Sequence, residues 1–221
     1  SQAGIAIYNA QLFGQVQQQV VALEAKTKDI NALYDLSVTA GSSLNRQVLL
    51  SALIDRIPEK LGHLGVIGGA ILLNKGKFGE FSLEALTKTR FSEKIIKYFK
   101  RKIAQNSVIG QDVSTSPVLK QIVQTKLSLT TASLTEIFPD FLKKRDDKAL
   151  KVLANINSYT LVPLMTDQQI NGLVLFAFNI PKDQISKRQN ELLQVFANHI
   201  STTLENIDLF EKLSKQYEKV E

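Results

Sequence analysis

Residues 158–178 read SYTLVPLMTDQQINGLVLFAF, and this stretch decides the fold. Two apolar runs flank the polar segment TDQQ, a pattern that predicts a hairpin of two strands. A second pair of runs, GVIGGAILLNKGKFGEFSLEAL at residues 65–86, predicts another hairpin with its turn near NKGKFG. Helical patterns stand between and around these hairpins. We therefore expect an α+β domain, built on a central antiparallel sheet of about five to six strands with helices on its faces.

Shorter elements are predicted around the hairpins. Residues 43–62, SLNRQVLLSALIDRIPEKLG, form an amphipathic pattern with Ser43 as a helix cap. The inward positions of that helix are expected to be Val48, Leu49, Ala52, Leu53 and Ile57. Residues 90–105 predict a further helix, and Ser116-Pro117 suits the start of another. Residues 127–133, LSLTTAS, alternate as a short strand.

Long helices are predicted at both ends of the chain. Between Gly4 and Thr39, apolar residues recur at gaps of three, four or seven, which indicates a narrow seam for a partner helix. The last part of the chain starts a helix near Ser186 and keeps the same period to its end. Residues expected to pair these helices in a parallel homodimer are Leu12, Val16, Val20, Leu23, Ile200, Leu204 and Ile207.

The composition of the chain indicates a globular protein and excludes several kinds of site. The chain has 221 residues, 44% hydrophobic and 22% charged, as in an ordinary globular protein. It has no cysteine, which excludes disulfides, thiolate metal sites and a thiol nucleophile. It also lacks a signal-peptide pattern and any apolar run long enough to span a membrane. We expect a cytoplasmic protein without membrane insertion in this segment.

Positive charge is concentrated in one segment. The net charge is +6, and residues 88–102 hold seven basic residues against the single acidic Glu93. The segment predicts either a solvated helix face or an electropositive rim for an anionic ligand. Proteins that bind single-stranded nucleic acid place aromatic side chains among the basic ones. The charged side of this segment has no aromatic residues, so a nucleic-acid partner is not expected.

Several stretches resemble the GAF domain, a sensory and regulatory module of bacterial signalling proteins. LYDLS at residues 33–37 is similar to the start of that family, and GGAILLN at residues 68–74 to its first strand. SPVLKQIVQTKLSLTTASL at residues 116–134 is similar to its short helix and strand, and residues 158–178 to its hairpin. The resemblance implies a GAF/PAS-like sheet, a domain over residues 29–210 and helices that carry signals at both ends.

Two similar stretches near the ends of the sequence suggest a tandem arrangement of domains. AIYNAQLFGQV at residues 6–16 matches TLENIDLFEKL at residues 203–213 in register, with Asn, Leu and Phe at the same places. Residues 203–213 resemble the exit helix of a GAF domain, so residues 1–28 are interpreted as a linker helix leaving a preceding domain. Residues 211–221 then begin the next signalling helix.

The resemblance also implies where a ligand would lie. The family pocket corresponds to residues 109–153, and its candidate lining residues are Phe91, Thr130, Phe138, Phe141 and Tyr159. The cofactor is unknown; a bilin linked through cysteine is excluded because the chain has none. No catalytic or metal-binding motif is present. His63 and His199 are isolated in the sequence and belong to no such motif, so no catalysis is expected.

The sequence therefore predicts a sensory domain that takes part in signal transduction. A small molecule or a neighbouring domain would shift the pairing of dimeric helices and bias an output domain, of the histidine kinase or nucleotide cyclase type in a two-component or related system. The alternative is a dimerising spacer that binds no ligand.

Overall fold

The computed structural model describes residues 8, 11–24, 26–27, 30–31, 45–88, 108–140 and 142–217. The chain divides into two compact units, residues 1–35 and 36–221. The described residues of the first unit are helical, as predicted, and their large apolar side chains are exposed to solvent. The predicted helix over residues 90–105 lies outside the described residues.

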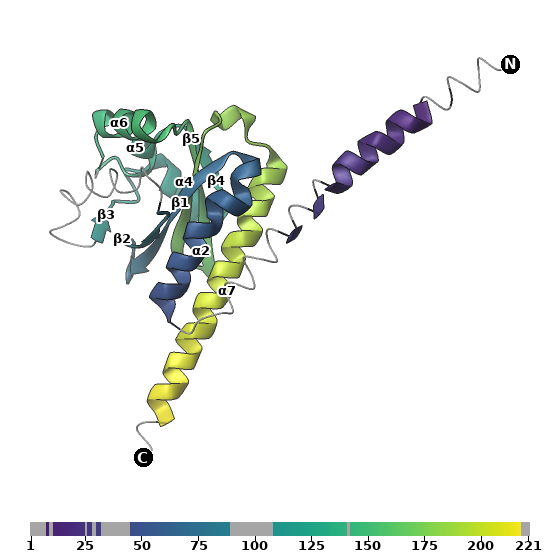
Figure 1. The fold of residues 1–221 in the computed structure, drawn as a ribbon. Coiled ribbons are helices and arrows are strands. Elements are labelled where there is room, and N and C mark those ends of the chain that lie inside the picture. The colour runs from purple at the N-terminus through teal and green to yellow at the C-terminus, as the bar shows by residue number, and fades with distance from the viewer. Residues whose placement is uncertain are drawn as a thin grey trace. The chain divides into compact units, whose positions relative to one another are not determined.

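The second unit is an α+β domain built on one antiparallel sheet (Figure 1). Its six strands lie in the order β3-β2-β1-β6-β5-β4. The strands are β1 (Val66–Lys75), β2 (Lys77–Leu86), β3 (Val108–Gly110), β4 (Leu129–Thr131), β5 (Ser158–Thr166) and β6 (Gln169–Phe178). The α-helices are α2 (Arg46–Leu61), α4 (Pro117–Thr125), α5 (Leu134–Ile137), α6 (Lys144–Ala154) and α7 (Lys187–Tyr217), and Gly62–Leu64 and Lys182–Gln184 form short 3₁₀ helices.

Both predicted hairpins are confirmed. Strands β5 and β6 meet in a tight turn at Asp167 and Gln168, whose φ angles of 47° and 63° are positive. Two consecutive residues of that kind make the turn whose twist matches antiparallel strands. Strands β1 and β2 turn at Gly76, where φ is 98°. Glycine adopts this conformation without steric strain, which explains its place in NKGKFG.

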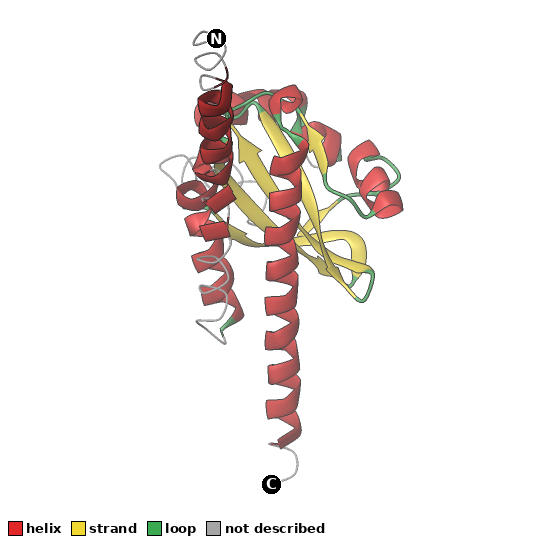
Figure 2. Ribbon diagram, turned by 90° about the vertical axis from the view of Figure 1, so that its right-hand side faces the viewer, coloured by secondary structure: helices red, strands yellow, loops and turns green. Residues whose placement is uncertain are grey.

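Helices α2 and α7 cover one face of the sheet and lie side by side (Figure 1 and Figure 2). Gly69 permits the close approach of α2, because a Cβ there would lie 3.3 Å from both Ile54 and Ile57. Its neighbour across the sheet, Phe176, meets Phe196 of α7 edge-to-face, with the ring centroids 5.9 Å apart. We call this side of the sheet the α2–α7 face.

Helices α4 and α5, with the loops that flank α6, cover the opposite face, here called the α4–α6 face. A buried apolar cluster joins them to the sheet: Leu72, Phe81, Val118, Leu119, Ile122, Leu134, Ile137, Phe138, Leu142, Ile156, Tyr159, Leu161 and Leu173. The rings of Phe81 and Phe138 meet edge-to-face at 6.4 Å. The sheet thus has an apolar layer on each side.

Helix caps agree with the sequence in two places. Ser116 accepts a hydrogen bond from the backbone N–H of Leu119, and Ser186 accepts one from that of Gln189. The cap of α2 is Asn45, whose side chain accepts from the N–H of Val48; the predicted Ser43 lies outside the described residues. The prediction that Val48 faces inward is wrong, since its side chain is exposed.

Candidate functional site

The predicted pocket residues do not form one site. Tyr159 and Phe138 lie together in the buried cluster of the α4–α6 face. Thr130 is on the opposite face: its hydroxyl contacts the hydroxyl of Thr160 at 2.9 Å and donates to Asn190 of α7 at 3.5 Å. In a strand, successive side chains point to opposite faces, and it is Thr131 that pairs with Tyr159. Phe91 and Phe141 lie outside the described residues.

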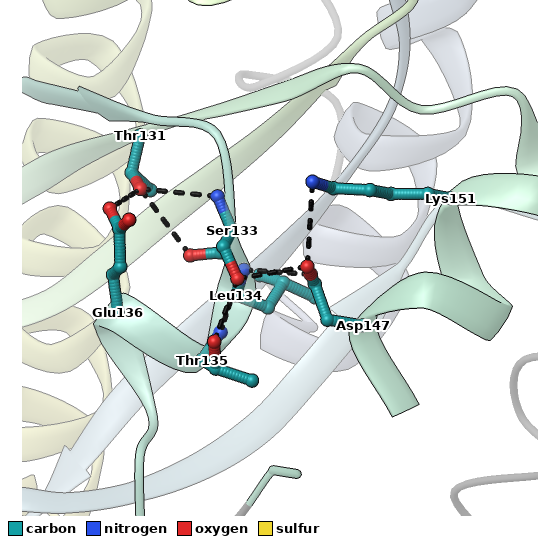
Figure 3. A network of polar contacts seen from close by, with 7 residues as sticks. All are labelled: Thr131, Ser133, Leu134, Thr135, Glu136, Asp147 and Lys151. Carbon is teal, nitrogen blue, oxygen red and sulfur yellow. Dashed lines mark hydrogen bonds and ion pairs between the residues drawn. The ribbon is translucent and has the colours of Figure 1, made fainter. Parts of the chain in front are cut away.

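A polar network caps α5 and links it to α6 on the α4–α6 face (Figure 3). Its centre is Asp147, a carboxylate that is 6% exposed. One oxygen accepts from the backbone N–H of Leu134 at 2.9 Å, and the other accepts from the Ser133 hydroxyl at 2.8 Å. The Nζ atom of Lys151, one turn along α6, lies 3.5 Å from the second oxygen. The network is called the Asp147 network below.

The Asp147 network extends to the end of β4. The Thr131 hydroxyl bonds to the Glu136 carboxylate and accepts a hydrogen bond from the backbone N–H of Ser133 at 3.2 Å. The Ser133 hydroxyl in turn accepts from the N–H of Thr135 at 3.2 Å, which caps the single turn of α5. These polar groups already have partners within the protein, an arrangement that fixes α5 and α6 in place.

Tyr159 is the cross-strand neighbour of Thr131, a member of this network, and is almost fully buried. Among the described residues, its hydroxyl has no hydrogen-bond partner. Burial, and secondly the negative charge of Asp147, raise the pKa of Tyr159 far above its ordinary value of 10.0. The hydroxyl therefore stays protonated to higher pH than that of an exposed tyrosine, and it is closed to solvent.

A second network holds the loop before α4 against the loop after α5. Gln111 is buried, and its amide donates to the carboxylate of Asp140 at 2.6 Å and to the hydroxyl of Thr115 at 2.8 Å. The backbone N–H of Asp140 donates back to the amide oxygen of Gln111 at 3.1 Å. No sequence motif marks Gln111 or Asp147, because both stand in ordinary polar runs whose burial depends on tertiary packing.

The seam predicted on the last helix needs a correction. Ile200, Leu204 and Ile207 are buried within the domain, so they cannot also present a surface to a second helix. The large apolar residues that α7 exposes are Val195 near its start and, further along it, the group Leu209, Phe210 and Leu213. In the first unit, Leu12, Val16, Val20 and Leu23 are exposed, and their role as a seam stays a prediction.

The basic segment is described only at its start. Lys88 contacts Asp55 of α2 twice: its backbone N–H donates at 2.8 Å, and its Nζ atom lies 3.4 Å from the carboxylate. Residues 89–102 lie outside the described residues. Within the described part of the chain, no group of acidic or histidine side chains could hold a metal ion, and no helix is long and apolar enough to cross a membrane.

Comparisons with solved structures identify the fold. A GAF domain of a phosphoenolpyruvate-protein phosphotransferase from Coxiella burnetii matches at a TM-score of 0.60 and 9% identity, over 84% of this chain and 98% of that one. Residues 122 to 287 of a methyl-accepting chemotaxis protein match at 0.54 and 15% identity, over 81% and 99%. The free methionine-R-sulfoxide reductase of Neisseria meningitidis matches at 0.54 and 13% identity, over 82% and 90%.

The similarity lies in the structure. No protein-family model matches the sequence, and the search of curated proteins found no match. At these identities the comparison establishes the GAF fold, as the sequence predicted, and leaves the activity open. The same fold occurs in a reductase, so the fold does not exclude catalysis. A reduction that uses protein thiols is unavailable to these 221 residues, which include no cysteine.

Proposed function

We propose that the chain is a sensory or regulatory GAF domain of a cytoplasmic signalling protein, which passes conformational change along α7 through a parallel homodimer. The observation that carries the proposal is that α7 has a buried part and, beyond it, a part that exposes apolar side chains. One continuous helix, Lys187–Tyr217, is buried in the domain at Ile200, Leu204 and Ile207 and then exposes an apolar stripe at Leu209, Phe210 and Leu213. A helix is stiff over this length, so a shift at the sheet moves the exposed stripe.

The exposed stripe has the spacing of a coiled-coil seam. Leu209 and Leu213 occupy the d and a positions of a heptad whose preceding a position is Asn206, which is also exposed. An isolated asparagine at an a position favours one register and one oligomeric state, since it pairs with its counterpart across the dimer. This arrangement favours two parallel α7 helices in register.

The N-terminal helix repeats the pattern. Asn9, Val16, Leu23 and Ile30 follow one another at intervals of seven residues. The last three are exposed, as are Leu12 and Phe13, the counterparts of Leu209 and Phe210. The repetition supports the tandem hypothesis, in which residues 1–28 leave one domain as α7 leaves this one. The output domain that the family resemblance implies is of the histidine kinase or nucleotide cyclase type.

A second candidate is the dimerising spacer that binds no ligand. Dense packing around Phe138 and Tyr159 favours it, because these residues fill the region where the resemblance places the pocket. Both candidates need the helix pair. They differ in whether a small molecule changes the pairing.

Sedimentation of the full chain tests the helix pair. We expect a dimer for the native chain and a monomer for Leu213→Asp, because a carboxylate at an a position faces its counterpart across the seam. Val152→Asp is the matched control: it places the same charge on an exposed apolar position of α6, and should leave the dimer intact. A native chain that is strictly monomeric at high concentration would contradict the proposal.

A further inference from the structure

A hollow of about 820 Å³ opens at the end of the sheet where both hairpins turn. Its walls come from the start of α2, the end of α4, the β1–β2 and β5–β6 turns and the second half of α7, all within residues 36–221. The volume falls in the range of small-molecule sites. The hollow does not include Phe138, Tyr159 or the Asp147 network, so it is separate from the site described above.

Polar atoms without partners gather around this hollow. Arg46 Nε, Asn74 Oδ1 and Ser201 Oγ are each shielded from solvent and have no hydrogen-bond partner among the described residues. All three residues line the hollow, and Ser201 is 6% exposed. Polar atoms buried in this way normally have a partner, and because these three are closed to solvent, a ligand supplies one only if side chains around the hollow move.

The charges of the lining are balanced. Three basic and three acidic side chains line the hollow: Arg46, Lys126, Lys212, Asp167, Glu205 and Asp208. A singly charged molecule would leave part of this lining uncompensated. A molecule that carries both charges can compensate both kinds of side chain at once.

The ion pair at the rim shows where such a molecule would enter. Arg46 Nη1 donates to Asp208 Oδ1 at 3.2 Å, and the two side chains are 40% and 46% exposed. A half-exposed pair of this kind is weak and opens easily. The guanidinium can hold a ligand carboxylate through two parallel hydrogen bonds, while the released Asp208 can accept from an ammonium group.

We infer that the hollow between the hairpin turns and α7 binds a small zwitterion of the amino-acid class. Its carboxylate takes the place of Asp208 on Arg46, and its ammonium group lies against Asp208 or Glu205. Asp208 immediately precedes Leu209, so this exchange acts on α7 at the start of its exposed stripe. The binding stands independently, whereas its effect on helix pairing rests on the proposed function.

The test uses the full chain labelled with ¹⁵N and the common L-amino acids as probes at millimolar concentration. At least one amino acid should shift the amide resonances of Asn74, Ser201 and Asp208. Its deaminated and decarboxylated analogues, which keep the same side chain, should bind more weakly by about tenfold or more. Arg46→Gln should weaken binding to a similar extent, whereas Lys88→Gln, which opens a similar ion pair outside the hollow, should not.

Three results would overturn the inference: no amino acid shifts these resonances, an analogue with one charge binds as tightly, or Arg46→Gln binds as the native chain does. Sedimentation keeps this test separate from the proposed function. A chain that dimerises but binds no amino acid overturns the hollow as a site. A chain that binds an amino acid but stays monomeric overturns the helix pair.

Discussion

The α4–α6 face and the α2–α7 face of the sheet both have apolar layers, but polar contacts tie their helices differently. On the α4–α6 face, the buried Asp147 and Gln111 bind the backbone and side chains of neighbouring loops. Among the described contacts of α7, the polar ties lie near its start, at Gln189 and Asn190, and at Asp208. Between these points its buried side chains are mainly apolar.

The difference indicates which helix can move. Hydrogen bonds have one preferred geometry, so the α4–α6 face behaves as a fixed block. Apolar contact is non-directional, and an interface held mainly by such contact can shift by small amounts at little cost. The comparison therefore supports the proposal that α7 transmits conformational change while α5 and α6 give structural support.

The largest expected effect is a loss of stability, and it should be of similar size on both faces. Phe81→Ala on the α4–α6 face and Phe196→Ala on α7 each remove a fully buried ring. Each should lower the free energy of unfolding by about 3–5 kcal/mol, because a cavity remains. Urea unfolding measures both. A much smaller loss for Phe196→Ala would show that α7 is held less firmly by apolar packing than we infer.

Loss of a polar contact should lower the free energy of unfolding more on the α4–α6 face than on α7. Asp147→Ala leaves the N–H of Leu134 without its acceptor and should cost about 2–4 kcal/mol. Asp208→Ala removes a half-exposed ion pair and should cost less than about 1 kcal/mol. The two aspartates act as matched controls in the same urea experiment. Equal losses would remove the distinction between a fixed block and a movable helix.

The smallest effect concerns Tyr159. Tyr159→Phe removes a buried hydroxyl that has no partner among the described residues, so stability at neutral pH should stay constant or rise by about 1 kcal/mol.

Tyr159 also predicts a pH dependence. Its pKa is raised above the unfolded value of 10.0, so its stabilising contribution is complete below that pH and is lost as the pH rises further. The loss attributable to Tyr159 should approach about 1.4 kcal/mol per pH unit. Urea unfolding from about pH 9 to about pH 11 should show a shallower decline for Tyr159→Phe than for the native chain. Tyr8→Phe changes an exposed residue and should decline as the native chain does.

The sequence predicted the fold well where local chemistry decides it. The hairpin at residues 158–178, the turn at Gly76 and the caps at Ser116 and Ser186 each follow from residue type and spacing. The hairpins account for the β1–β2 and β5–β6 pairs, whereas the β1–β6 pair that joins them was not predicted. The GAF resemblance supplied the arrangement of the helices, which local patterns alone do not fix.

The site was harder to predict because it depends on which face a residue takes. Thr130 and Thr131 are the same residue type, so the sequence could not show that Thr130 faces α7. Helix α7 carries two apolar stripes, and periodicity alone could not tell that Ile200 belongs to the one on the sheet. Asp147 stands in the run KKRDDK, where nothing marks one aspartate as buried.

Disulfide cross-linking tests the central claim, that α7 pairs in parallel and in register. The chain has no native cysteine, so each variant carries a single reactive thiol. Asn206→Cys and Leu213→Cys place that thiol at a positions, and Glu211→Cys places it at an exposed position away from the seam. We predict rapid covalent dimers for the first two variants and slow dimers for Glu211→Cys, because only seam residues come within disulfide distance of their counterparts. Equal rates at all three positions, or cross-linking at only one of the two a positions, would contradict the account.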